Sequence, residues 1–212
     1  MKSSPERLAK TRGRPRAFDR EEALERAMQV FWRQGYEATS LADLTAAMGI
    51  NPPSLYAAFG DKERLFLEAV DRYESCHRGS AADGSLFGEE PTARRAIEHL
   101  LRDAVDELVR PGQPHGCMLM TAATNCSAES IQSALAERRA RSKSLIRKRI
   151  AKGIADGELP SGTDAGALAE FYTTVLAGMS MQARDGATRK SLEATVAAAL
   201  RAWPEERAQR RA

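Results

Sequence analysis

Residues 39–62 read TSLADLTAAMGINPPSLYAAFGDK. Ser40 is a typical residue to cap a helix, and Gly49 suits the tight turn that ends it. Asn51 and Pro52 then begin a second helix, because proline at the first helical position costs no hydrogen bond. Two short helices joined by a tight turn are typical of a helix-turn-helix that reads DNA. The alternative is an ordinary helical hairpin with capping hydroxyls.

The second of these helices, residues 52–59, would enter the major groove with its N-terminal residues toward the base edges. Leu55 and Phe59 hold it to the core and leave a face of prolines and alanines outward. Such a face forms no bidentate hydrogen bonds, so we expect specificity to depend on Ser54, on apolar contacts and on DNA shape. The outward residues are Pro52, Pro53, Ser54, Ala57 and Ala58, with Tyr56 at the side.

Apolar residues at helical spacing predict helices on both sides of this stretch. Asp19 caps one over residues 20–34, and Asp61 caps another over residues 62–73. Residues 79–91 are rich in Gly, Ser and Ala and are expected to form a loop. A second helical block should follow, with segments near residues 97–108, 118–123, 128–155, 165–179 and 188–203. No segment alternates as a strand does, so the sequence predicts an all-α fold.

The composition narrows the class of protein. The chain has 212 residues, of which 42% are hydrophobic and 29% charged, which suits a soluble globular protein of one or two domains. No window approaches the about 18 uninterrupted apolar residues of a membrane helix. We therefore expect a cytoplasmic protein with no membrane partner. Three cysteines, at positions 76, 117 and 126, do not indicate a disulfide framework.

The sequence contains no recognisable metal-binding or catalytic motif. His77 follows Cys76, and His115 lies two residues before Cys117, but neither spacing matches a zinc framework. No Gly-rich phosphate loop and no nucleophile elbow is present. We expect no metal and no cofactor. A helical enzyme stays as a rival interpretation, which polar groups converging in a cavity would favour.

Residues 19–73 resemble the TetR family of transcriptional regulators. The resemblance implies an all-α protein with a three-helix DNA-binding domain and a larger helical domain for ligand binding and dimerisation. The residues that carry it are Ala27 with Phe31, Gly35-Tyr36, Thr39-Ser40, Leu44, Gly49, Leu55-Tyr56, Phe59 and Lys62-Glu63-Leu65.

The resemblance also implies which residues contact operator DNA, mostly through phosphates: Thr39, Ser54, Tyr56 and Lys62. Ser40 offers a further hydroxyl at the same flank, where phosphates lie. The chain departs from the family at Ala58, where many members have histidine. The contact made by that histidine is therefore absent.

The N-terminal arm is strongly basic. Residues 1–16 hold six Lys and Arg against the single Glu6, a balance of +5 that leaves −2 for the rest of a chain of net charge +3. Such an arm is a nucleic-acid contact or a disordered tail. Its segment Arg12-Gly13-Arg14-Pro15-Arg16 resembles an AT-hook core, which favours insertion of Arg14 into an A·T-rich minor groove beside each half-site.

The second helical block is expected to contain a sensor for an unknown small-molecule effector. Methionines and aromatics line adaptable pockets, but they also fill cores. That a pocket exists is implied mainly by the family resemblance. The candidate lining residues are Met118, Met120, Phe171, Tyr172 and Met179, together with Cys117.

Cys117 begins a helix within the segment Pro114-His115-Gly116-Cys117. A Gly-Cys at this place resembles a TetR subgroup that includes electrophile and oxidant sensors. A cysteine at a helix N-terminus near a histidine is expected to have a lowered thiol pKa. The alternative is that Cys117 is a small buried apolar residue. Cys76 and Cys126 are weaker candidates.

The last two helices carry a stripe of small and apolar residues. Two such helices from each of two chains can form a four-helix bundle, and the resemblance implies that interface. A two-fold dimer would present its reading helices about one DNA turn apart, ~34–36 Å or somewhat more, to a near-palindromic operator. The predicted interface residues are Ala177, Gly178, Met181, Leu192, Val196, Ala199 and Leu200.

The predicted organisation has four parts: a basic arm (1–17), a DNA-binding domain (18–62), a regulatory and dimerisation domain (63–204) and a tail (205–212). Basic residues near 137–152 form a solvated helix face or, alternatively, a second nucleic-acid surface. Together these features predict a dimeric DNA-binding regulator, most simply a repressor released by a ligand or by cysteine modification. A DNA-binding protein without a sensor is the remaining rival.

Overall fold

The computed structural model describes residues 18–78 and 84–204 of the 212-residue chain. Every regular element within these ranges is a helix, which confirms the predicted fold class. The predicted arm contacts, Arg12, Arg14 and Arg16, lie outside the described residues. In the part that the structure describes, no helix has the length and apolar character needed to cross a membrane.

The N-terminal helices are α1 (Arg20–Gln34), α2 (Leu41–Met48), α3 (Pro52–Phe59) and α4 (Lys62–Tyr73). Each begins after a side chain that accepts a backbone N–H of the first turn, which satisfies donors that a helix leaves free. Gly49 ends α2 in the left-handed conformation, with φ of 68°, and so turns the chain into α3. The four caps are Asp19, Ser40, Asn51 and Asp61, all predicted from the sequence.

The connection to the second block is more helical than predicted. A π-helical turn, η1 (Glu74–Arg78), continues α4, and a short helix, α6 (Leu86–Glu89), lies inside the stretch that we predicted as a loop. Leu86 is fully buried against α7, and this tertiary contact explains a helix that the Gly- and Ser-rich composition does not predict.

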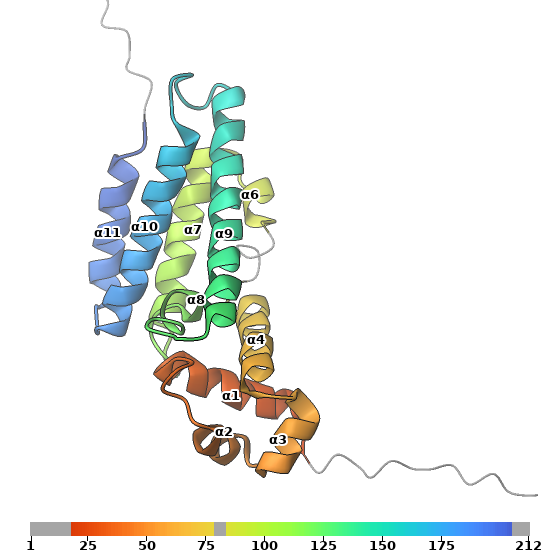
Figure 1. The fold of residues 1–212 in the computed structure, drawn as a ribbon. Coiled ribbons are helices and arrows are strands. Elements are labelled where there is room, and N and C mark those ends of the chain that lie inside the picture. The colour runs from red at the N-terminus through yellow and green to blue at the C-terminus, as the bar shows by residue number, and fades with distance from the viewer. Residues whose placement is uncertain (1–17, 79–83, 205–212) are drawn as a thin grey trace, which may run out of the picture.

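The second block is a bundle above the N-terminal helices (Figure 1). Its helices are α7 (Ala93–Leu108), the short α8 (Met118–Thr121), α9 (Glu129–Ala155), α10 (Ala165–Arg184) and α11 (Arg189–Arg201). In Figure 1, α10 and α11 lie side by side at one edge, and α8 lies just above α1. The positions of α9, α10 and α11 agree with the sequence prediction.

The buried apolar residues form two separate cores. The first core is built from the inner faces of α1 to α4, and it also takes in residues of α8, of the α8–α9 connection and of the first turns of α9: Met118, Leu119, Ala122, Cys126, Ile131 and Leu135. The second core joins α7, the middle of α9, α10 and α11. Cys117 packs against both cores. The cores therefore do not divide the chain at residue 62, because α8 packs with the N-terminal helices.

Candidate DNA-binding surface and effector cavity

The second helix of the helix-turn-helix, α3, exposes the face that the sequence predicts. Leu55 and Phe59 are buried in the first core and hold α3 in place. Tyr56 is 47% exposed, one of only three large hydrophobic residues so exposed among those the structure describes. The other exposed residues of this face are Pro52, Pro53 and Ala57, while Ser54 and Ala58 are half-buried.

The predicted flanking residues fall into two groups. Ser40 is exposed and shares a capping box with Asp43, whose carboxylate accepts hydrogen bonds from Ser40 that lower the pKa of Asp43. Lys62 is half-buried, with its ammonium 4.4 Å from the centre of the Tyr36 ring. Both residues remain at the edge of the helix-turn-helix.

Thr39 differs from the prediction, because it is only 1% exposed. Its hydroxyl donates a hydrogen bond of 2.6 Å to the carbonyl of Gly35, at the end of α1. In this structure the side chain fixes the α1–α2 connection and does not lie on the outer face. The sequence pattern cannot distinguish a hydroxyl that points outward from one that closes a turn.

A cation that we did not predict lies at the same edge. Neither α2 nor α3 contains Lys or Arg, so any cationic contact to phosphates must come from outside the two helices. The Arg64 side chain, in the first turn of α4, is 75% exposed and lies 3.8 Å from Asp61, a long and weak ion pair. Its exposure, which the sequence does not reveal, makes it available to a phosphate.

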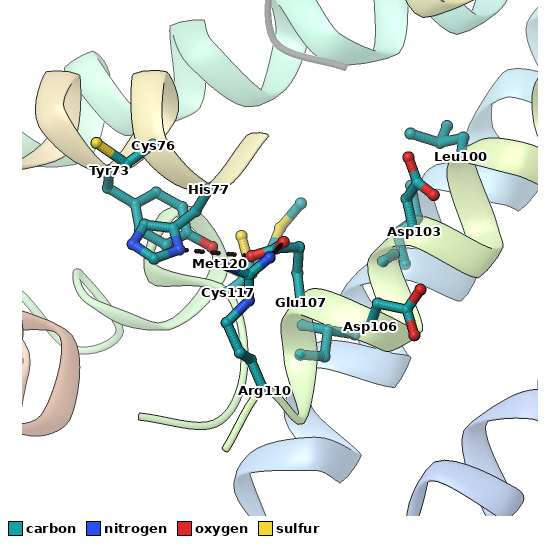
Figure 2. A pocket seen from close by; sticks show the side chains of 13 residues that line it. Tyr73, Cys76, His77, Leu100, Asp103, Asp106, Glu107, Arg110, Cys117 and Met120 are labelled. Carbon is teal, nitrogen blue, oxygen red and sulfur yellow. Dashed lines mark hydrogen bonds and ion pairs between the residues drawn. The ribbon is translucent and has the colours of Figure 1, made fainter. Parts of the chain in front are cut away.

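A cavity of about 440 Å³ lies between the two cores. Tyr73 and His77 line it from the end of α4 and η1, and Leu100, Leu108 and Leu176 line it from α7 and α10. In Figure 2, the side chains of α4 and η1 lie on one side and those of α7 on the other, with Cys117 and Met120 between them. A molecule in this cavity would therefore contact both halves of the protein.

The charged groups at the cavity are largely paired, some of them with one another. The Nδ1 atom of His77 lies 3.4 Å from a carboxylate oxygen of Glu107, which also pairs with Arg110. Burial, followed by the nearby charge of Arg110, lowers the pKa of His77, so this side chain is neutral at neutral pH. Burial also raises the pKa of Asp103 on the opposite wall.

The three cysteines have different surroundings. Cys117 is half-buried and Cys76 exposed, and both line the cavity. Cys126 is buried in the first core, where burial raises its thiol pKa. The histidine that lines the cavity is His77, from a different part of the chain than His115, which is exposed.

Of the predicted ligand-binding residues, only Cys117 and Met120 line the cavity. Met118 is buried in the first core, and Met179 in the second. Tyr172 points toward α11, where its hydroxyl donates to the carbonyl of Ala199 and burial raises its pKa to about 12.

Phe171 does not line the cavity and is 39% exposed. Phe171, Tyr172, Met118 and Met179 therefore do not line this cavity, contrary to what the sequence suggested, and their part in ligand binding stays a prediction. Apolar spacing alone does not separate a cavity wall from a core or an outer face.

The predicted dimer residues also divide. Leu192, Val196 and Ala199 are buried in the second core of their own chain, so they are not free for a partner. Ala177 and Leu200 are half-buried. Gly178 and Met181, which is 46% exposed, lie on the outer face of α10.

Half of the eight basic side chains of α9 form ion pairs within the chain. Arg138 pairs with Asp71 and Glu74, and Arg149 is buried beside Glu158. The remaining pairs join Lys143 to Glu170 and Lys152 to Asp156. The described residues also contain no group of three or more His, Cys, Asp or Glu side chains that could hold a metal ion.

Two family models match the chain and between them cover most of it. Residues 23–69 match the model for bacterial regulatory proteins of the tetR family. Residues 93–203 match the model for a tetracyclin repressor-like C-terminal domain. The chain belongs to the TetR family of transcriptional regulators.

Relatives of this TetR-family chain include the HTH-type transcriptional repressors ComR and BdcR of Escherichia coli strain K12. ComR is 38% identical over 200 residues, which cover 93% of this chain and 95% of ComR. BdcR is 32% identical over 187 residues, which cover 88% of this chain and 90% of BdcR. The chain is thus similar along nearly its whole length to transcriptional repressors.

Among solved structures, a cysteine mutant of the TetR family regulator CifR bound to a 26-base-pair operator DNA has a TM-score of 0.85 and 49% identity. The match covers 90% of this chain and 100% of the CifR chain. A TetR regulator from Rhodococcus sp. RHA1 matches with a TM-score of 0.60 and 42% identity, over 86% of this chain and 98% of its own. The fold is therefore one that binds operator DNA in CifR.

Proposed function

We propose that this TetR-family regulator is a dimeric repressor, released from a near-palindromic operator when a small molecule or a thiol reagent reacts or binds in the cavity beside Cys117. The observation that carries the proposal is the position of that cavity, between the two cores. The first core belongs to helices α1 to α4, called the DNA reader below, and the second core belongs to the bundle. A protein that acts on operator DNA works in the cytoplasm, which is the location we propose.

The DNA contacts that we propose combine a shaped apolar face with cations at its edge. Pro52, Pro53 and Ala57 are exposed on α3 and can touch thymine methyl groups, while Tyr56 and Ser54 supply hydroxyls. Ser40, Lys62 and Arg64 lie at the edge, where phosphates would be bound. Without a bidentate base contact on α3, affinity should depend strongly on phosphate contacts and therefore on salt.

The effector step that we propose at Cys117 is addition of its thiolate to an electron-poor carbon–carbon double bond. The sulfur forms a bond to one carbon, the double bond becomes single, and the neighbouring carbon takes a proton from water, so no group leaves. The adduct would occupy the cavity between the two cores and contact both, so it can favour a different placement of one core relative to the other. Operator affinity should then fall by the few-fold to about 150-fold typical of allosteric coupling.

This effector step is tested by treating the purified protein with N-ethylmaleimide and measuring affinity for an operator selected from random DNA. Wild type and Cys76→Ser should lose affinity, whereas Cys117→Ser should keep it. Mass spectrometry confirms that each remaining thiol has reacted. Loss of affinity in Cys117→Ser equal to that of wild type would remove Cys117 from the mechanism.

We propose that the dimer forms through the outer face of α10 and α11. Phe171, Gly178 and Met181 are exposed along one stripe of α10, and two of the three exposed large hydrophobic residues in the described part of the chain lie there. The exposed residues of α11 include the small side chains Ala194, Ala197 and Ala198, which allow close helix packing. An apolar face of this kind marks an interaction site.

The dimer is tested with Met181→Glu, which places a charge in that stripe. Sedimentation should show a monomer, and operator affinity should fall at least about tenfold, because one reading helix then binds without its partner. Ala151→Glu, on the exposed side of α9, is the matched control and should stay dimeric. A dimer of Met181→Glu as tight as wild type would place the interface elsewhere.

The two rival functions predict different cavities. A regulator without a sensor should have a sealed core, and the cavity of about 440 Å³ argues against that. A helical enzyme should hold converging polar groups, and His77, Glu107 and Arg110 do converge. These groups are paired with one another, and the relatives are named as regulators, so we favour an effector site.

A further inference from the structure

The peptide group between Gly116 and Cys117 hydrogen-bonds both the DNA reader and the bundle, close to a direct bond from the Arg184 guanidinium of α10 to the carbonyl of Arg33 in α1. Its carbonyl oxygen accepts a 3.0 Å hydrogen bond from the indole Nε1 of Trp32, near the end of α1. Its N–H donates a 2.7 Å hydrogen bond to the hydroxyl of Ser180 on α10. Because a peptide group is planar and rigid, the two bonds relate the orientation of α1 directly to that of α10.

The partners of this peptide group are buried and firmly placed. Trp32 is 1% exposed and packs edge-on against the rings of Tyr73 and His77, with centroids 4.8 and 5.0 Å away. Ser180 is fully buried, so an unmade hydrogen bond there would cost stability. The bond from Trp32 is buried and the bond to Ser180 is partly buried, and a hydrogen bond away from water is costly to lose.

Gly116 shows how closely the connection is built. It has a φ of +86°, a conformation that favours glycine, and a Cβ added there would lie 2.9 Å from the carbonyl oxygen of Ser180. Only a residue without a side chain lets the peptide approach α10 this closely. Cys117, which follows, turns its side chain to the cavity and packs against both cores.

Further bonds hold the same segment to the DNA reader. The amide of Tyr36 donates to the carbonyl of Ala122 at 2.7 Å. The backbone N–H and hydroxyl of Ser127 both donate to Glu37. The segment from Gly116 to Ser127 is therefore attached to the end of α1 at several points, whereas the Gly116–Cys117 peptide is where it also bonds α10.

The geometry points to Trp32 and Ser180 as positioning residues that set the distance between the two reading helices of the dimer, through the shared Gly116–Cys117 peptide. The inference rests on the proposed function, because it requires a dimer that binds two half-sites through α10 and α11. A chemical change at Cys117 would then rotate the Gly116–Cys117 peptide, and this rotation would shift α1 through Trp32.

The test uses Ser180→Ala, which removes one hydroxyl and leaves the helix otherwise unchanged. Thr173→Ala is the matched control, since that hydroxyl also lies on α10 but donates only within its own helix, to Ala169. Affinity is measured for the operator selected by wild type and for the same operator with one base pair inserted between its half-sites. The ratio of the two affinities reports spacing preference, which a general loss of stability does not change.

Wild type and Thr173→Ala should discriminate equally between the two operators. Ser180→Ala should lose at least about threefold of that discrimination, because the hydrogen bond that ties the peptide to α10 is removed. A second variant carries benzothienylalanine at position 32, which keeps the ring shape but has no N–H, and it should behave like Ser180→Ala. Wild-type ratios in both variants would overturn the inference and leave the proposed repressor intact.

A measurement without DNA tests the positioning role of Ser180 separately from the proposed repressor function. Spin labels on a ketone-bearing amino acid at position 57 report the distance between the reading helices of the dimer. The distance distribution should broaden in Ser180→Ala and stay narrow in Thr173→Ala. An unchanged distribution in Ser180→Ala would contradict the inference, whatever N-ethylmaleimide does to operator affinity.

Discussion

The two cores differ in how they are filled. The first core contains a series of aromatic rings in edge-to-face contact, including Phe31 with Phe66 at 5.0 Å and Trp32 with Tyr73 at 4.8 Å. The second core is mainly aliphatic, with Tyr172 and Trp203 near one end. Aromatic pairs have preferred geometries, whereas aliphatic side chains repack more readily. The DNA reader is thus suited to rigidity and the bundle to adjustment, and the cavity lies between them.

The comparison also shows that the first core is not local in sequence. It depends on α8 and on Ile131 and Leu135 at the start of α9, which follow the DNA reader only after the whole of α7. A movement of these residues within the bundle would therefore displace the DNA reader without any change in α2 or α3.

The largest effect should come from cutting the chain after residue 78. The fragment keeps α1 to α4 but loses the apolar residues of α8 and α9 and the acceptor of Trp32. Without these residues the fragment buries less apolar surface when it folds, and burial is the main driving force for folding. The fragment should therefore show no cooperative thermal transition by circular dichroism. A fragment that melts cooperatively near the temperature of the full chain would show that the first core is self-sufficient.

A smaller effect should follow from Phe66→Ala, which deletes a fully buried ring at the centre of the first core. The free energy of unfolding should fall by about 3–5 kcal/mol, as for other buried aromatic truncations. Urea unfolding measures it. Leu101→Ala, in the second core, is the variant for comparison. At low temperature, we expect Leu101→Ala to keep more of the operator affinity than Phe66→Ala does. Equal losses of affinity would argue against a rigid reader and an adjustable bundle.

A still smaller effect is expected at the start of the reading helix. The amide oxygen of Asn51 accepts the backbone N–H of Ser54, so Asn51→Ala should cost about 0.5–2 kcal/mol of stability. Asn51→Ser restores a capping oxygen and should recover most of the loss. Both variants are compared by urea unfolding and operator binding. If Asn51→Ala and Asn51→Ser were equally destabilised, the cap would not be the cause.

The smallest effect should be a pH dependence at the seam between the cores. Folding lowers the pKa of His77 from 6.5, chiefly by burial. Just below pH 6.5, His77 is therefore protonated more fully in the unfolded chain than in the folded protein. Stability should therefore be complete above about pH 6.5 and decrease as the pH falls below it. The charged groups nearby are Glu107, Arg110, Arg72 and Glu25.

The measurement is urea unfolding at several pH values in wild type and His77→Gln. The variant should lose the part of the acid dependence that His77 contributes. An acid dependence identical in the two proteins would mean that His77 does not resist protonation.

Local signals in the sequence predicted the helix-turn-helix well. The capping side chains, such as Ser40 and Asn51, bond to backbone within three residues, so their role depends on near neighbours alone. The exposed face of α3 followed from the buried positions Leu55 and Phe59.

Contacts between distant segments could not be predicted in this way. Leu192 and Val196 lie on an apolar stripe, which shows that a face is buried but not whether it is covered by its own chain or by a partner. The cavity wall combines η1, α7 and the Gly116–Cys117 segment, and no periodic pattern links these three. The same holds for the role of His77, whose neighbours come from α1 and α7.

The burial of Trp32 against Tyr73 and His77 places a fluorescent side chain at the contact between the DNA reader and the bundle. The chain has two tryptophans, and Trp203 lies at the far end of the second core. Trp203→Phe would leave emission from Trp32 alone, next to an imidazole that quenches indole light when protonated. The intensity and wavelength of Trp32 emission would then report, in real time and without a label, whether the DNA reader still packs against the bundle.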